Sequence, residues 1–261
     1  MIKLIVSDID GTLVNNEKEV PVSFWKAFER MQELDILFCV ASGRQIQSLH
    51  ELFAPIKNNI AYAPDNGASL IYQNKTLFEK LITPADYLPI MRTCNEINGI
   101  GVALCGRDRA YIKTDSEWIF DEIARHYPAH TMVSDFAAID DDIFKITICD
   151  EGISRLNSYQ YLKKYQNDFN VVISGEIWLD ITGKDVNKGN AITHLQRILE
   201  ITPEETVVFG DHMNDVEMIQ CAKHSYAMKN AQEELKALAK YVTEYDNNEA
   251  GVVKEIEKIL K

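Results

Sequence analysis

Strand-like apolar runs alternate with helix-like stretches at both ends of the chain, and this alternation constrains the fold more than any other feature. In the first third, IKLIV, ILFCVA and NIAYA are expected to be strands, with helices over about 21–34 and 44–53 between them. The final third repeats the rhythm, with strands at TVVFG and SYAM and helices over about 187–199, 214–221, 233–239 and at the closing end. Apolar strands separated by helices are typical of a parallel sheet covered on both faces.

The middle of the chain follows a different pattern. It predicts a helix, a strand pair at GVALC and AYIKT, a helix, the strand IFKITIC, a helix and the strand VVISG. This order favours an open sheet with helices on one face. The sequence therefore predicts an α/β parallel-sheet core formed by residues 1–82 and 183–261, interrupted by an inserted α+β domain over 83–182.

Composition narrows the function classes. The chain has 261 residues, of which 46% are hydrophobic, so it can bury a large core. Its formal net charge of -13 argues against a nucleic-acid partner or an anionic membrane surface. No stretch resembles a secretion signal or a membrane span, and the five cysteines show no CxxC spacing. We expect a cytoplasmic protein with reduced thiols, and a monomer fits these features.

The stretch DIDGTLV, residues 8–14, places two carboxylates directly after a buried strand. Because Asp8 and Asp10 repel each other there, a metal ion or a substrate held by one is expected beside them. A solvated turn is the simplest alternative. A calcium loop is a second, but it requires a glycine where this chain has Leu13 and a helix where it has a strand.

Polar residues also follow two other core strands. Ser42, Gly43 and Arg44 come after the second strand, and GDHMND follows TVVF, while Lys188 opens the helix before TVVF. The carboxyl ends of parallel strands meet at one edge of the sheet, so these groups are expected to converge. Carboxylate oxygens suit Mg²⁺. A lysine, a hydroxyl and an amide at a helix start suit phosphate oxygens, and the set predicts phosphoryl transfer.

The motifs DIDGTLV, ASGR, NKG and GDHMNDVEM resemble, in order, the four motifs of the haloacid dehalogenase-like superfamily. The inserted segment, with NGA at 66–68 and MKNA at 228–231, resembles its Cof-type branch, subclass IIB. The resemblance implies a Rossmann-like core with a C2B-type cap. It also implies a Mg²⁺-dependent phosphatase of small phosphorylated metabolites.

Residue roles follow from the resemblance. Asp8 matches the nucleophile that forms an aspartyl-phosphate, and Asp10 matches the general acid/base, which requires a raised pKa. The implied Mg²⁺ ligands are the carboxylates of Asp8 and Asp211 and the backbone carbonyl of Asp10. Asp215 matches a carboxylate that supports the metal's water shell or Lys188. The implied phosphate contacts are the backbone of Ile9, Ser42, Gly43, Lys188 and Asn214, and Asn66 and Arg44 are further candidates near the substrate.

Sugar phosphates are the substrates that the resemblance favours, and phosphorylated cofactors such as pyridoxal phosphate or flavin mononucleotide stay open. One alternative is a sugar phosphomutase, in which the nucleophile returns its phosphoryl group to a sugar. An alternative of another class is a non-enzymatic module that binds a phosphate or sugar phosphate or serves phospho-signalling. In receiver domains, however, the phosphorylated aspartate lies on a later strand than the acidic pair. Here the expected acceptor follows the first strand.

Overall fold

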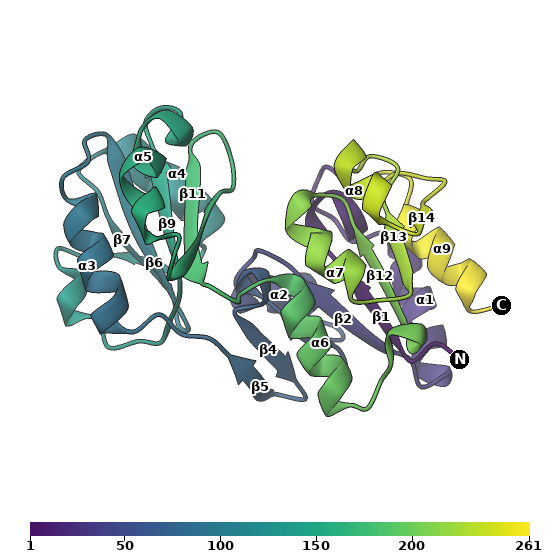
Figure 1. Ribbon diagram of the computed structural model, residues 1–261. Coiled ribbons are helices and arrows are strands. Elements are labelled where there is room, and N and C mark those ends of the chain that lie inside the picture. Colours follow the sequence, from purple (N-terminus) through teal and green to yellow (C-terminus); the bar gives the residue numbers. More distant parts are fainter. The chain divides into compact units, whose positions relative to one another are not determined.

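The computed structural model describes residues 1–261 and divides into two compact units. Unit 1 consists of Met1–Glu79 and Asn187–Lys261, and unit 2 is the continuous segment Lys80–Val186. The expected boundaries at 83 and 182 lie inside unit 2 by three residues at its start and by four at its end. Each unit has its own sheet (Figure 1), with one hydrophobic core in unit 1 and two in unit 2.

Unit 1 contains an eight-stranded sheet in the order β14-β13-β12-β1-β2-β3-β4-β5. The first six strands in this order are parallel, while β4 and β5 form an antiparallel hairpin at one edge. The strand bounds are β1 (Leu4–Ser7), β2 (Leu37–Ala41), β3 (Ala61–Ala63), β4 (Ser69–Tyr72), β5 (Lys75–Glu79), β12 (Thr206–Gly210), β13 (His224–Ala227) and β14 (Tyr241–Val242).

Helices cover both faces of this sheet, with α6 and α7 on one side and α1 and α9 on the other (Figure 1). The helix bounds are α1 (Val22–Glu33), α2 (Ile46–Leu52), α6 (Lys188–Ile198), α7 (Val216–Gln220), α8 (Glu233–Leu238) and α9 (Gly251–Ile259). Gly189 makes the close approach of α6 to α7 possible, because a Cβ there would lie 2.3 Å from the backbone carbon of Glu217. All four residues of β1 are buried, as expected for a central strand covered on both faces.

Unit 2 contains a six-stranded sheet in the order β10-β11-β9-β6-β7-β8, antiparallel except for the β7–β8 pair. Its elements are α3 (Pro84–Cys94), β6 (Ile100–Gly106), β7 (Ala110–Lys113), α4 (Glu117–His126), β8 (His130–Met132), β9 (Ile143–Asp150), α5 (Ser158–Leu162), β10 (Phe169–Ile173) and β11 (Trp178–Gly183). The strands β8 and β11, and β14 in unit 1, were missed by the sequence pattern because their alternation is short or mixed.

The prediction that helices cover one face of the middle sheet was wrong. Ile146 and Ile148 of β9 share a core with residues of α3 and α5, whereas Cys149 shares a second core with Ile119 and Ile123 of α4. Successive strand residues point to opposite faces, so helices lie on both sides of this sheet. All eight residues of β9 are buried, which agrees with two covered faces.

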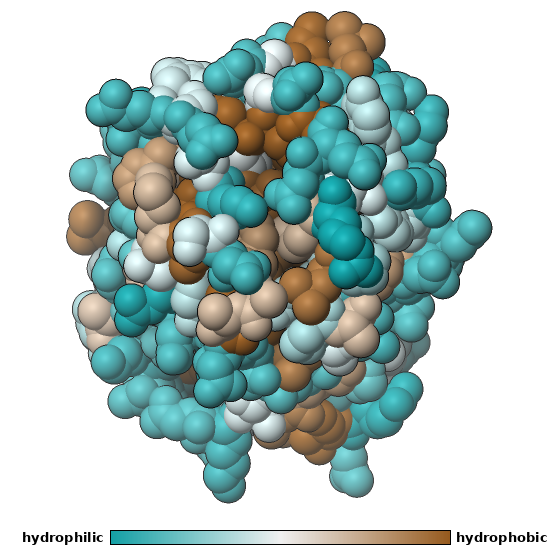
Figure 2. Space-filling model, turned by 90° about the vertical axis from the view of Figure 1, so that its left-hand side faces the viewer, coloured by the Kyte–Doolittle hydropathy of each residue, from teal (hydrophilic) through white to brown (hydrophobic).

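The surface of the molecule is mostly hydrophilic on the side shown in Figure 2, with hydrophobic residues interspersed among the polar ones. None of the helices combines the length and the apolar character that crossing a membrane would need.

Candidate functional site

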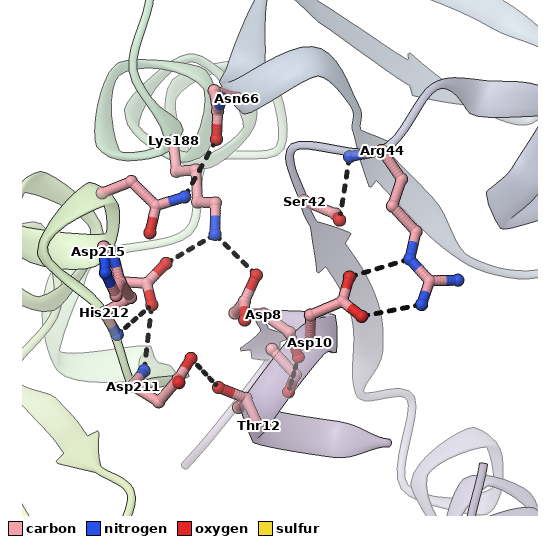
Figure 3. A network of polar contacts seen from close by, with 12 residues as sticks. Asp8, Asp10, Thr12, Ser42, Arg44, Asn66, Lys188, Asp211, His212 and Asp215 are labelled. Atoms are coloured by element: carbon pink, nitrogen blue, oxygen red, sulfur yellow. Dashed lines mark hydrogen bonds and ion pairs between the residues drawn. The ribbon is translucent and has the colours of Figure 1, made fainter. Parts of the chain in front are cut away.

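The carboxyl ends of β1, β2 and β12 bring the predicted polar residues of unit 1 together (Figure 3). Asp8 follows β1, and Asp211 and Asp215 follow β12. Carboxylate oxygens of these three residues all lie within 4.8 Å of one another. The convergence expected from the parallel-strand pattern is therefore present in the folded chain.

Lys188 is the cation at the centre of this cluster. Its side chain is wholly buried, and its Nζ donates hydrogen bonds of 2.6 Å to Oδ1 of Asp8 and of 2.6 Å to Oδ1 of Asp215. Burial alone would lower the pKa of Lys188, but the two carboxylates outweigh burial and raise it. Lys188 is thus a fixed positive charge at the first turn of α6.

Three carboxylates share this single lysine, and the pKa of Asp8 reflects the imbalance. Burial is the largest effect and raises the pKa of Asp8, while Lys188 lowers it. The charges of Asp215 and Asp211 raise it further, and the pKa of Asp8 reaches about 8. The pKa of Asp211 is raised as well, mainly by burial and Asp215. A divalent cation would relieve this excess of negative charge, so the donor set fits a hard metal ion such as Mg²⁺.

Asp215 has both carboxylate oxygens engaged by the protein. One accepts from Lys188, and the other accepts from the backbone amides of Asp211 at 2.9 Å and His212 at 3.2 Å. The side chain therefore orients Lys188 and the loop that carries Asp211. Gly210 leaves room for it, since a Cβ at that position would lie 2.6 Å from Oδ2 of Asp215.

Asp211 is held against the turn that carries Asp10. Oδ1 of Asp211 accepts a hydrogen bond of 3.0 Å from the hydroxyl of Thr12. Gly11 has a φ of +77°, and a Cβ there would lie 2.3 Å from Oδ2 of Asp211. The D-x-D-G-T motif thus needs its glycine for the turn and for space, and its threonine for the bond to Asp211.

Asp10 lies apart from that cluster and pairs with two other cations. Its Oδ1 accepts from Nη2 of Arg44 at 2.8 Å and from Nζ of Lys18 at 2.7 Å, and its Oδ2 accepts from Nε of Arg44 at 2.8 Å. Burial raises the pKa of Asp10, but hydrogen bonds from Arg44 and Lys18 outweigh burial and lower it to about 2. The expected raised pKa of Asp10 is therefore wrong for this arrangement of side chains, because two cations converge on one carboxylate.

The predicted phosphate contacts lie around this edge of the sheet. The Ser42 hydroxyl accepts from the amide of Arg44 at 3.1 Å, and Asn214 donates to Oδ1 of Asn66 at 3.0 Å. The Asn66 side chain also lies beside Gly43, where a Cβ would be 3.3 Å from its Oδ1. Ile9 has a fully buried side chain, so only its backbone can contribute to the site.

The sequence interpretation missed two residues that the structure adds. Thr12 was part of the quoted motif but received no role, and Lys18 lies eight residues beyond Asp10 in a loop without a recognisable pattern. Only the final position of the D-x-D-G-T motif gave a signal for Thr12. No local signal marks Lys18.

Comparison with known proteins agrees with this site. The family model for haloacid dehalogenase-like hydrolases matches residues 5–256. The chain is 31% identical to the 5-amino-6-(5-phospho-D-ribitylamino)uracil phosphatase YbjI of Escherichia coli K12, over 100% of this chain and 97% of the relative. It also resembles the crystal structure of SMU.1108c from Streptococcus mutans UA159, with a TM-score of 0.89 and 30% identity, covering 100% of this chain and 99% of that one.

A further similar structure is that of BT4131, described as a subclass IIB sugar phosphatase, with a TM-score of 0.82 and 25% identity over 98% of each chain. These matches run along nearly the whole length of both units. The chain therefore belongs to the haloacid dehalogenase-like hydrolases, within their Cof-type branch, subclass IIB.

Proposed function

We propose that this phosphoric monoester hydrolase is a Mg²⁺-dependent phosphatase of small phosphorylated metabolites that acts through an aspartyl-phosphate on Asp8. The convergence of Asp8, Asp211 and Asp215 around buried Lys188 carries the proposal. Relatives named as a ribitylaminouracil phosphatase and a sugar phosphatase support sugar-like phosphate esters as the substrate class.

The carboxylates of Asp8 and Asp211 and the backbone carbonyl of Asp10 would hold the Mg²⁺. Three carboxylates and one lysine carry a formal charge of -2, which a divalent cation balances. When bound, the cation offsets the repulsion between a carboxylate nucleophile and a phosphate dianion. Asp215 keeps Lys188 and the loop carrying Asp211 in place.

In the first step, a carboxylate oxygen of Asp8 forms a bond to phosphorus as the bond from phosphorus to the ester oxygen breaks. Asp10 gives its proton to the departing alkoxide, and Lys188 offsets the charge on the transferred group. Ser42, the Gly43 amide, the backbone of Ile9 and Asn214 surround the phosphoryl oxygens. For Asp10 to hold a proton, its contacts with Arg44 and Lys18 must weaken when substrate binds.

In the second step, water attacks the phosphorus of the aspartyl-phosphate. Asp10 takes the proton of that water, the bond between phosphorus and the Asp8 oxygen breaks, and inorganic phosphate leaves. The two carboxylates divide the work once ligands bind, because Asp8 must lose its proton to bind Mg²⁺ and Asp10 must gain one to act as the acid. Asp8 lies beside Lys188, whereas Asp10 lies beside Arg44 and Lys18.

We expect the enzyme to act in the cytoplasm. All five cysteines are free thiols, and four of them are buried. Buried free thiols are compatible with a reducing compartment, where they act as small core residues.

Phosphate release from a panel of sugar phosphates, phosphorylated cofactors and nucleotides tests the proposal, with Mg²⁺ or with a chelator. Asp8→Asn is expected to lose at least about 10³-fold in kcat, because the amide is a poor nucleophile. The matched control is Asp121→Asn, at an exposed carboxylate on α4. Chelator-resistant release, or an active Asp8→Asn variant, would contradict the proposal. Transfer of the phosphoryl group to a sugar in place of release would indicate the phosphomutase.

Asp10→Asn tests the acid/base role separately. A loss of about 10² to 10⁴-fold in kcat is expected, while Mg²⁺ and inorganic phosphate still bind. Isothermal titration of both ligands distinguishes this outcome from a collapsed site. A kcat equal to that of the unaltered protein would remove Asp10 as the acid/base.

A further inference from the structure

Lys18 and Arg44 form a cationic rim around Asp10, and the proposed chemistry assigns no group of the substrate to them. The two side chains come from different loops of unit 1 and meet on one carboxylate, at 2.7 Å for Lys18 and 2.8 Å for both Arg44 nitrogens. Two cations and one carboxylate leave this rim with a formal charge of +1. The buried cluster around Asp8 has the opposite sign, so the site carries two electrostatically distinct sides.

The backbone holds Lys18 in a conformation that its residue type disfavours. Lys18 has a φ of +66°, in the left-handed region that glycine and asparagine adopt at lower cost. The loop around it is closed by hydrogen bonds from the Lys18 amide to the Asn15 carbonyl and from the Glu19 amide to the Asn15 side chain. Because this geometry would suit glycine or asparagine better, the contact of Lys18 with Asp10 is what gives its side chain a role.

Residues 247 and 248, near the C-terminus, form hydrogen bonds to the start of the loop that carries Lys18. Buried Asn247 donates to the carbonyl of Val14 at 3.0 Å and to Oδ1 of Asn16 at 3.2 Å, and the amide of Asn16 donates to Asn248 at 3.0 Å. These bonds hold the first residues of the loop from which Lys18 extends.

The rim is open to a ligand. The side chain of Lys18 is 60% exposed and that of Arg44 is 23% exposed. Arg44 contacts Asp10 through Nε and Nη2, and Figure 3 shows its third guanidinium nitrogen pointing away from Asp10. An arginine fork and a lysine together are well suited to a carboxylate or phosphate group.

We propose that Lys18 and Arg44 make this enzyme selective for phosphate esters whose leaving group carries a second anionic group, a carboxylate or phosphate, close to the ester oxygen. The inference rests on the proposed function, because the group that protonates the leaving oxygen must lie on the leaving-group side of the phosphorus. Asp10 has that role, so its two cationic partners lie on that side as well. An anionic leaving group competes with Asp10 for these cations.

A matched pair of substrates tests the selectivity. Glycerol 2-phosphate and 2-phosphoglycerate differ only in a carboxylate that replaces one hydroxymethyl group beside the ester. The ratio of their kcat/KM values is measured for the full-length protein with Mg²⁺. Both compounds are also measured as competitive inhibitors of p-nitrophenyl phosphate hydrolysis, so a compound that is not turned over still gives an inhibition constant.

The unaltered protein is expected to favour 2-phosphoglycerate by about fivefold or more. Lys18→Asn, which removes the charge and tolerates the left-handed backbone, is expected to lower that preference about three- to fivefold. Raising the salt concentration is expected to lower it too, because the cations are exposed. The control Lys26→Gln, at an exposed lysine on α1, is expected to keep the preference.

Equal kcat/KM values and equal inhibition constants for the two compounds would overturn the inference. A preference that is unchanged in Lys18→Asn would overturn it as well. If p-nitrophenyl phosphate and the pair are hydrolysed with Mg²⁺ but without preference, only the selectivity is wrong and the phosphatase stands. If none of these compounds nor any member of the wider panel is hydrolysed, the proposed function is wrong and the selectivity falls with it.

Discussion

Single residues decide how charge is distributed at this site. Asp8, Asp211 and Asp215 share one lysine, whereas Asp10 alone has two cationic partners. The carboxylates of Asp8 and Asp10 are two positions apart in the chain, yet their pKa values are moved in opposite directions. The neighbouring charges, rather than the residue type, thus separate the two pKa values.

Gly11 gives a direct test of how tightly Asp211 is held. Gly11→Ala would place a Cβ 2.3 Å from Oδ2 of Asp211 and would strain a φ of +77°. We expect a loss of about 1–2 kcal/mol in the free energy of unfolding. Weaker Mg²⁺ binding should accompany it, measured by isothermal titration. The control is Gly152→Ala, where a Cβ meets nothing within 4 Å. Mg²⁺ affinity unchanged in Gly11→Ala would show that this turn does not position Asp211 for the metal.

The pKa of Asp8 predicts a pH dependence of Mg²⁺ stabilisation. Burial and the charges of Asp215 and Asp211 raise that pKa to about 8, against the opposing effect of Lys188. For a raised carboxyl pKa, the stability contribution of Asp8 in the metal-free protein is complete below about pH 4 and is lost as pH rises toward 8. Mg²⁺ requires the deprotonated carboxylate, so its stabilising effect should grow over the same range.

The measurement is the increase in Tm that Mg²⁺ produces between about pH 5 and pH 8. Asp8→Asn removes one titrating ligand and should give a smaller increase that varies less with pH, because the pKa of Asp211 is raised as well. An increase that is constant with pH in the unaltered protein would contradict the assigned cause.

At the scale of elements, the turn between β4 and β5 consists of Gln73 and Asn74, which is not the sequence that this type of turn prefers. Gln73 and Asn74 both have positive φ, 51° and 58°, which is the geometry of a two-residue turn that prefers Asn-Gly. Asn74→Gly should therefore stabilise unit 1 by about 0.5–1 kcal/mol, measured by urea unfolding. Thr76→Gly, in the extended strand β5, is the matched control and should destabilise it. Loss of stability in Asn74→Gly would show that another contact of Asn74 dominates.

At the scale of the whole molecule, unit 2 has the properties of an insertion that folds by itself. It is one continuous segment with its own two hydrophobic cores. Its two ends lie together, since a Cβ at Gly183 would be 2.8 Å from Cγ of Lys80. Adjacent ends allow a domain to be inserted into a loop of another without distorting either.

The excised segment 80–186 is accordingly expected to fold and to unfold cooperatively in urea, as monitored by circular dichroism. Ile146→Asp, at the centre of β9, should abolish that transition because it buries a charge in the core. A broad, non-cooperative change in the unaltered segment would mean that unit 2 depends on unit 1. In the full chain, Mg²⁺ should raise the unfolding temperature of unit 1 only.

The sequence by itself determined the strand and helix rhythm of unit 1 and the groups that follow its strands. Apolar runs such as IKLIV and TVVFG form strands because burial on both faces requires them to be continuously hydrophobic. Once those strands are parallel, Asp8, Ser42 and Asp211 must share one edge of the sheet. The sequence motif NKG likewise contains Gly189, the residue that allows α6 to pack closely against α7.

The tertiary structure alone decided which charges meet. The bond from Thr12 to Asp211 joins residues 199 positions apart, and the clamp of Arg44 on Asp10 spans 34. The order of elements in the middle segment predicted helices on one face of its sheet, and that prediction was wrong because α4 covers the second face. Local patterns record what a segment must bury. They carry no information on which side chains of other segments will surround a group, and those neighbours reversed the predicted pKa of Asp10.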